Sequence, residues 1–276
     1  MNYLHAFHAG NFADLVKHAT LLQLLERLAK TRSALSVLDT HAGRGLYNLS
    51  GNEAVRSGEA AAGIARLMQA KDLPAVFAGL RKAVTDLNTS GPLRFYPGSP
   101  CLVAGQLRSG DSYLGCELRP DEQAALVSAL KPYKNAHAIC SDGYGEATRK
   151  PINKPFDLIL IDPPFERADD YARIVQTLAA VAKVSPHATS LIWLPMKDLE
   201  TFDSLLRELE EAGIDDMLIA ETRMRPLSDP MKMNGCALLL TNPPPEFATV
   251  LSDICSWVAE TLGDHGQARV WHMGPP

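Results

Sequence analysis

The chain has 276 residues, of which 46% are hydrophobic and 21% charged, so it can form one large domain or two small ones. This composition excludes a disordered, collagen-like or low-complexity protein. The formal net charge of −5 also excludes a broadly basic nucleic-acid-binding surface, though not a local basic patch.

The cysteines and the first residues are typical of a cytoplasmic protein. The five cysteines are odd in number and none forms a C-x-x-C pair, so we expect reduced thiols and no metal site. The opening MNYLHAFHAG lacks the basic region and apolar run of a signal peptide. No apolar stretch approaches the ~18 residues of a membrane span, so we expect no membrane partner.

The N-terminal third predicts a helix, a strand, a glycine turn and then a helical segment. Apolar positions over 12–30 have the spacing of an amphipathic helix, and Asn11 is the expected N-cap. The run LSVLDT (35–40) is a predicted strand, and HAGRG follows it as a turn. Residues 47–97 contain helix-like stretches and no convincing strand, so we predict a helical insertion subdomain there.

Strand-like and helix-like runs then alternate along the rest of the chain. This alternation, with continuously apolar strands, predicts a parallel sheet with helices on both faces. The expected strands are 113–118, 136–142, 156–162 and 189–195, and the expected helices are 121–131, 170–183 and 199–212.

The C-terminal part predicts an antiparallel hairpin. Strands at 216–226 and 235–241 are joined by a polar loop, and a helix near 246–262 and an optional short strand at 268–272 follow. We therefore predict a single domain over 1–276. Its α/β fold is a doubly wound, mostly parallel seven-stranded sheet with the helical insertion and the C-terminal hairpin.

Acidic residues at the ends of neighbouring strands predict a nucleotide-binding crevice. Asp39 precedes the glycine turn, which lacks the third glycine of a dinucleotide site. Glu117 ends the second strand, where a carboxylate can hold ribose hydroxyls, and Asp142-Gly143 ends the third. Glu117 lies 78 positions after Asp39 instead of about 20, and the predicted insertion accounts for the surplus. Plain turns and solvated strand ends are the alternative at these positions.

The sequence Asp162-Pro163-Pro164-Phe165 follows the apolar run FDLILI and is the strongest local signal. Two prolines make a stiff turn after a strand. A fixed carboxylate and a backbone carbonyl can accept both N–H groups of an adenine amine as its nitrogen attacks a methyl group. An aromatic ring beside them can stack on the base. The alternative is a strand-terminating turn with a buried Phe.

Together these motifs resemble the bacterial 23S ribosomal RNA adenine-N6 methyltransferase family, which is S-adenosylmethionine-dependent and carries a D-P-P-[FY] motif and a helical insertion. The resemblance covers nearly the full chain, and the paired FHAGN and DTHAG motifs are specific. The matching segments are FHAGNFADLVKH (7–18) with Tyr3 upstream, LDTHAGRGLY (38–47), RSGE (56–59), GIARL (63–67), LRFYPGSP (93–100), CELRP (116–120), SDGY (141–144), LILIDPPF (158–165) and TNPP (241–244).

The resemblance implies a class I, Rossmann-like methyltransferase and a role for each matching residue. Asp162 would be the catalytic acceptor for the adenine amine, and Tyr3 and Phe165 would bind the RNA substrate. Phe165 stands where Tyr is commoner, which keeps the stacking face and loses a hydroxyl. Residues that would line the S-adenosylmethionine site are His18, His41, Ser99, Glu117, Asp142, Gly143 and Asp162.

Taken without the resemblance, some of these residues have simpler interpretations. His18 on an amphipathic helix reads as a satisfied surface or core residue, Lys17 as a solvated lysine and Ser99 as a turn residue. Trp193 and Trp257 read as core residues. The loop 226–234 contains Pro and Met where the family is usually more basic, so RNA docking there is in question.

The expected partner is 23S rRNA, either protein-free or in an early assembly intermediate, bound by a monomer. With an acidic chain, we expect RNA affinity to come from small basic groups around the crevice, namely Lys17, Arg44, Arg223 and Arg225. Two alternatives remain. One is a DNA adenine or protein glutamine methyltransferase, against which Asp162 and the lack of a target-recognition domain argue. The other is a non-catalytic nucleotide- or RNA-binding module on the same fold.

Overall fold

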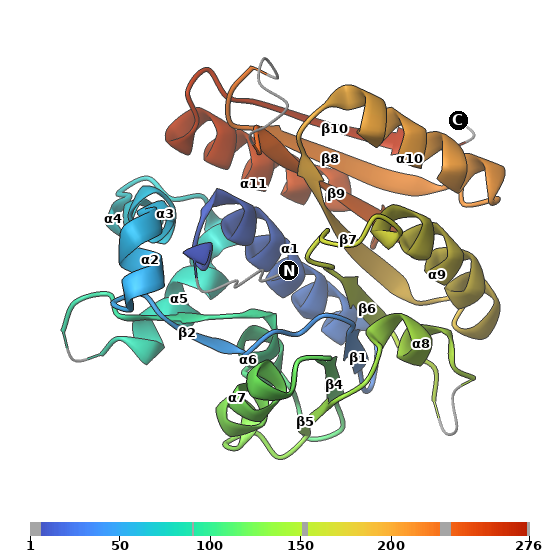
Figure 1. Ribbon diagram of the computed structural model, residues 1–276, viewed down its shortest axis with the longest axis horizontal. Helices are drawn as coiled ribbons and strands as arrows, with labels where there is room; N and C mark the ends of the chain where they lie inside the picture. The colour runs from blue at the N-terminus through green and yellow to red at the C-terminus, as the bar shows by residue number, and fades with distance from the viewer. Residues whose placement is uncertain (1–6, 90, 151–153, 227–232, 275–276) are drawn as a thin grey trace.

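A computed structural model describes residues 7–89, 91–150, 154–226 and 233–274. Its centre is an eight-stranded sheet in the order β10-β8-β9-β7-β6-β1-β4-β5 (Figure 1). The strands are β1 Ser36–Asp39, β4 Ser112–Cys116, β5 Ala136–Ile139, β6 Leu158–Ile161, β7 Thr189–Met196, β8 Met217–Arg223, β9 Gly235–Thr241 and β10 Gln267–Met273.

The predicted doubly wound, mostly parallel sheet is confirmed. Strands β5, β4, β1, β6 and β7 are parallel, and β9 pairs antiparallel with both β7 and β8, which confirms the C-terminal hairpin. The sheet has eight strands where seven were predicted, because β10 pairs along the whole length of β8. This edge strand is the segment expected as an optional short strand at 268–272.

Helices cover both faces of the sheet and form two apolar cores. The first core joins the sheet to α1, α5, α6, α7 and α11, and the second joins it to α8, α9 and α10. The helices are α1 Phe12–Thr31, α2 Asn52–Ser57, α3 Glu59–Ala62, α4 Ile64–Gln69, α5 Ala78–Leu87, α6 Ser99–Ala104, α7 Pro120–Leu130, α8 Gly143–Thr148, α9 Asp170–Val184, α10 Leu199–Glu211 and α11 Phe247–Leu262.

Helix α1 follows the sequence prediction closely. Asn11 caps it by accepting a hydrogen bond from the Asp14 backbone N–H. The helix is buried on nearly all sides, because the sheet and α11 cover one flank and the segment 47–97 covers another. The buried residues therefore include polar ones, Asp14, Lys17 and His18, which an amphipathic reading places at the surface.

The segment 47–97 is not purely helical. Strands β2 (Leu46–Asn48) and β3 (Phe95–Pro97) pair antiparallel at its two ends, so the expectation of no strand there is wrong. Three-residue strands are too short for a readable alternation, and their partners lie about 50 positions apart. In the sequence, helices α2 to α5 lie between β2 and β3. In space they lie to one side of the eight-stranded sheet (Figure 1).

The segment 47–97 packs closely on the start of α1. The Ile64 N–H donates to the Gly10 carbonyl at 2.8 Å, and a Cβ atom at Gly63 would lie 2.2 Å from that same oxygen. His8 and Asn11 both contact the Glu59 carboxylate.

Across the described ranges, no helix is long and apolar enough to span a bilayer.

Candidate active site

The carboxyl ends of β1, β4, β5 and β6 meet at one edge of the sheet. Backbone hydrogen bonds continue the pairing just beyond the strands, from Thr40 N to the Leu160 carbonyl and from Ala42 N to the Cys116 carbonyl. The Glu117 N–H likewise donates to the Ile139 carbonyl. The acidic residues predicted at separate strand ends are thereby brought to the same edge.

Asp39 ends β1 and is fully buried beneath this edge. Its Oδ2 accepts the Ser99 hydroxyl at 2.6 Å and the Tyr113 hydroxyl at 3.2 Å. Its Oδ1 accepts the His41 N–H at 3.3 Å. Burial raises the pKa of Asp39 to about 6. Ser99 is thus tied to the end of β1 across 60 positions of chain, a pairing that no local motif indicates.

The glycine turn and Glu117 form one unit. The Glu117 carboxylate accepts the Gly43 N–H at 3.1 Å and the Arg119 N–H at 2.9 Å. Burial raises the pKa of this carboxyl group above its usual range. Gly43 has a φ of +61°, and a Cβ atom there would also lie 2.6 Å from the Tyr47 hydroxyl. The turn therefore needs glycine for both its backbone shape and its close packing.

Asp142 and Gly143 join β5 to α8. Asp142 caps this helix by accepting the Tyr144 N–H, and its other oxygen pairs with Arg173. A Cβ atom at Gly143 would lie 2.0 Å from the Thr40 carbonyl oxygen. Gly143 is thus required by the approach of α8 to the turn after β1.

His41 lies between these two loops. Its Nδ1 is 2.8 Å from the Thr40 hydroxyl, and its ring meets Tyr144 edge-on with centroids 4.8 Å apart. Burial lowers the pKa of His41 to about 4. His41 is therefore neutral at physiological pH and can present a hydrogen-bonding nitrogen without adding charge.

Asp162 follows β6 and is paired with Lys17 of α1. The Lys17 Nζ is 2.5 Å from Asp162 Oδ2 and 3.1 Å from Asp14 Oδ1. The side chain of Lys17 is 6% exposed and that of Asp162 is 18% exposed. The expectation of a solvated Lys17 is therefore wrong, because the face of α1 that carries Lys17 is buried in the folded protein.

Phe165, three residues after Asp162, belongs to a group of aromatic side chains. Phe165 has a φ of +51°, and its ring centroid is 5.1 Å from Tyr171 and 5.9 Å from Trp193. Trp193 is only half-buried, and Lys17 Nζ lies 5.9 Å from its ring centroid. Sequence reasoning placed Trp193 in the core; it packs against the first core but also borders the site.

His18 is held away from the surface. It is 1% exposed, its Nδ1 is 2.7 Å from the Tyr96 hydroxyl, and its Nε2 is 3.8 Å from Asp14. This geometry agrees with the interpretation of His18 as a core residue with hydrogen-bonding partners. His18 and Lys17 both lie near the Asp14 carboxylate. Tyr3 and most of the loop 226–234 lie outside the described residues.

The basic groups expected around the crevice are mostly paired. Arg44 makes two hydrogen bonds to Glu122, at 2.9 and 2.7 Å, and Arg223 pairs with Glu221. Arg225 is exposed. Among the residues that the structure describes, no cluster of three or more His, Cys, Asp or Glu has a metal-binding arrangement.

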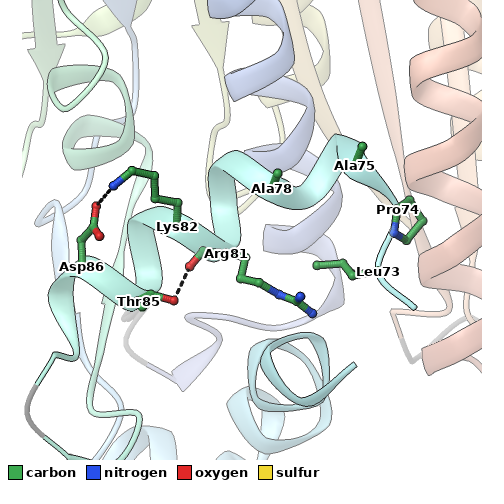
Figure 2. A pocket seen from close by; sticks show the side chains of 8 residues that line it. All are labelled: Leu73, Pro74, Ala75, Ala78, Arg81, Lys82, Thr85 and Asp86. Carbon is green, nitrogen blue, oxygen red and sulfur yellow. Dashed lines mark hydrogen bonds and ion pairs between the residues drawn. The ribbon is translucent and has the colours of Figure 1, made fainter. Parts of the chain in front are cut away.

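Two hollows lie away from the carboxyl ends of the strands. The one in Figure 2, of about 310 Å³, is bordered by α5 and the residues before it, and its Lys82 and Asp86 pair with each other. A second, of about 360 Å³, lies at the opposite ends of β1 and β4, near Ser36 and Ser112. Neither contains a residue of the predicted site.

The strand order, the acidic residues at the ends of β4, β5 and β6, and the proline turn define a class I α/β methyltransferase. A family model described as "Ribosomal RNA large subunit methyltransferase D, RlmJ" matches residues 32–273. The chain belongs to this family.

The chain is similar to several relatives over nearly the whole length of each. A protein of Haemophilus influenzae named ribosomal RNA large subunit methyltransferase J is 36% identical over 96% of this chain and 95% of the relative. A protein of the same name from Escherichia coli is 34% identical over 95% and 94%. The crystal structure of a Legionella pneumophila protein, 28% identical, has a TM-score of 0.87 and covers 96% of this chain and 98% of its own.

Proposed function

We propose that this protein transfers a methyl group from S-adenosylmethionine to the N6 amine of one adenine in 23S rRNA. The observation that carries the proposal is the position of Asp162. It lies in a stiff proline turn, beside Phe165, at the same edge of the sheet as Glu117 and Asp142. Membership of an rRNA methyltransferase family and the names of the two relatives support the substrate.

The carboxylates at this edge, which accept hydrogen bonds, fit the hydroxyl and amine groups of S-adenosylmethionine. The strand order β6-β1-β4-β5 places Asp162, the glycine turn, Glu117 and Asp142 in sequence along the edge. The cofactor has a methyl-bearing sulfonium, a ribose with two hydroxyls and an adenine with an amine, in the same order. Glu117 would therefore accept from the ribose hydroxyls, and Asp142-Gly143 would hold the adenine. His41, Ser99 and Asp162 would complete the lining of the cofactor site, and the buried His18 would support it through Asp14, which also pairs with Lys17.

The cofactor supplies an electrophilic methyl group, and the protein prepares the nucleophile. Asp162 and a backbone carbonyl of its turn accept the two N–H bonds of the target amine, which favours the tetrahedral nitrogen of the transition state. Lys17 fixes the Asp162 carboxylate from the α1 side. Phe165 stacks on the adenine, which must be unstacked from its neighbours before it can enter.

The remaining assignments complete the proposal. Tyr3 contacts the RNA, and the substrate is protein-free 23S rRNA or an early assembly intermediate. The protein acts as a cytoplasmic monomer without a metal. Residues 1–276 form a single methyltransferase domain in which 47–97 is an insertion subdomain, and the close packing of Gly63 on Gly10 supports treating the two as one unit.

The proposal is tested with labelled S-adenosylmethionine and 23S rRNA from a strain that lacks the equivalent enzyme. Protein-free rRNA and whole ribosomal subunits are compared, and the labelled nucleoside is identified. We expect N6-methyladenosine at a single position, and loss of transfer in Asp162→Ala with cofactor binding largely retained. No label in either RNA sample rejects the substrate. Label only on DNA or on protein glutamine selects the alternative methyltransferases, and cofactor binding without any acceptor selects a non-catalytic module.

A further inference from the structure

Arg173 of α9 contacts the first turn of α8 in two ways. Its Nη2 lies 2.5 Å from Asp142 Oδ2, and its guanidinium carbon lies 4.3 Å from the ring centroid of Tyr144. Tyr144 is 4% exposed and also packs edge-on against His41. A single arginine therefore links α9 to the carboxylate and the aromatic ring that follow β5.

These contacts fix the Asp142 carboxylate in one orientation. Oδ1 accepts the Tyr144 N–H at 3.2 Å and Oδ2 accepts from Arg173. The Asp142 side chain is nevertheless 42% exposed, whereas Arg173 is 23% exposed. Since each carboxylate oxygen can accept more than one hydrogen bond, Asp142 keeps accessible acceptor capacity while its rotation is blocked.

A lysine would not provide both contacts. The planar guanidinium stacks on an aromatic face and donates in its own plane, whereas an ammonium is a compact charge on a flexible stem. The arrangement thus depends on arginine chemistry.

We propose that Arg173 is a positioning residue that holds Asp142 for recognition of the exocyclic amine of the cofactor adenine. This inference rests on the proposed placement of the adenine at Asp142. The amine donates to an acceptor that is already oriented, so less conformational freedom is lost on binding. Removal of Arg173 leaves the N-cap bond to Tyr144 but frees the other oxygen to rotate.

The test measures binding of two ligands by calorimetry: S-adenosylhomocysteine and its purine-riboside analogue, in which hydrogen replaces the adenine amine. Both are uncharged at sulfur, so the measurement does not depend on attraction of a sulfonium. A hydrogen bond to a charged group predicts that the wild type prefers the adenine ligand by roughly 10-fold or more. Arg173→Met should lose most of this preference, and Arg173→Lys should retain part of it.

Lys183→Met is the matched control, because Lys183 is an exposed lysine in the last turn of the same helix. It should keep the wild-type preference. Thermal unfolding of each variant shows whether it is folded. If the Met variant is not folded, Arg173→Gln takes its place: it lacks the charge and the guanidinium plane and should also lose much of the preference. Addition of Arg173→Met to Asp142→Asn should cause little further change in the preference.

The inference is overturned if Arg173→Met weakens both ligands equally, which would mean a general structural effect. It is also overturned if Asp142→Asn leaves the preference intact, and in that case the adenine placement fails too. The binding measurement involves no RNA. Absence of methyl transfer would therefore reject the proposed RNA substrate and leave this inference to be decided by the ligand preference alone.

Discussion

Lys17 and Asp162 form a direct ion pair although 145 positions of chain separate them. Lys17 also reaches Asp14, so one buried ammonium lies between two carboxylates, one from its own helix and one from the proline turn. Ion pairs on both sides hold the buried side chains in one orientation. Loss of one partner leaves a buried charge uncompensated, which carries a large desolvation penalty. Helix α1 is thereby connected to the orientation of the residue that we assign to catalysis.

Lys17→Met should therefore reduce both stability and activity. It leaves Asp14 and Asp162 without their shared cation, which should lower the free energy of unfolding by about 3 kcal/mol or more. Methyl transfer at saturating S-adenosylmethionine should fall at least tenfold. Urea unfolding and initial rates measure the two effects. Lys30→Met in the same helix, where the Lys30–Glu26 pair is exposed, should cost at most about 0.5 kcal/mol. Equal losses in the two variants would refute the importance of the buried pair.

The acidic edge was predictable from the sequence, whereas this cation was not. Asp39, Glu117, Asp142 and Asp162 each follow an apolar run, and parallel strands bring their carboxyl ends to one edge. The exposure of Lys17 depends on how α1 is covered by distant segments, which its own periodicity does not encode. The partial exposure of Trp193 likewise depends on distant segments.

Pairings between distant segments account for the other gaps. Strands β2 and β3 are three residues each and find one another across the insertion, so no local alternation announces them. The bond from Ser99 to Asp39 likewise depends on where α6 packs. Helix bounds, in contrast, depend on local caps and periodicity, and α1, α9 and α11 were predicted to within a residue or two.

Gly143→Ala should impair cofactor binding through the backbone alone. Its Cβ atom would lie 2.0 Å from the Thr40 carbonyl oxygen and 2.4 Å from the Thr40 Cα atom, and both belong to rigid backbone. The start of α8 must move away from the turn after β1, which displaces Asp142. Gly145→Ala is the matched control, since nothing lies within 4 Å of a Cβ atom there. The control should be neutral or stabilised by up to about 1 kcal/mol. Calorimetry with S-adenosylhomocysteine distinguishes them, and unchanged affinity in Gly143→Ala would contradict this account.

Asp39 should make stability depend on pH in an unusual direction for a carboxylate. Its pKa is raised from 3.8 to about 6 by burial, so the folded state binds more protons than the unfolded state between these values. Stability from this group therefore falls as pH rises from about 4 to 6. Asp39→Asn removes the titration. The free energy of unfolding of the variant, relative to wild type, should rise across this window by at most about 3 kcal/mol. Urea unfolding at pH 4.5 and 7 gives the difference, and a constant difference would show that Asp39 does not titrate there.

RNA binding should depend only moderately on salt. Arg44 is held by Glu122, whereas Arg225 is exposed just beyond β8. Because β8 runs in the same direction as β7, Arg225 lies at the same edge of the sheet as Asp162. We expect Arg225→Gln to make the slope of log affinity against log salt shallower by about 0.7 to 0.9, the contribution of one phosphate contact. Arg44→Gln should leave the slope nearly unchanged. Filter binding of an rRNA fragment between 50 and 200 mM salt decides the matter, and the reverse order of effects would relocate the RNA contact to Arg44.

Phe165 should contribute to the binding of the target base through its ring. Its positive φ and its contacts with Tyr171 and Trp193 fix the ring three residues after Asp162. Stacking of a base on an aromatic side chain is worth about 1–3 kcal/mol. Phe165→Ala should therefore reduce kcat/KM for rRNA by roughly 5- to 150-fold, with little change in the affinity for S-adenosylhomocysteine. Phe165→Tyr keeps the stacking face and should retain most activity, whereas Phe165→Leu keeps apolar volume without the π-system and should resemble Ala. If Leu is as active as Tyr, the side chain acts by filling space and the stacking role is wrong.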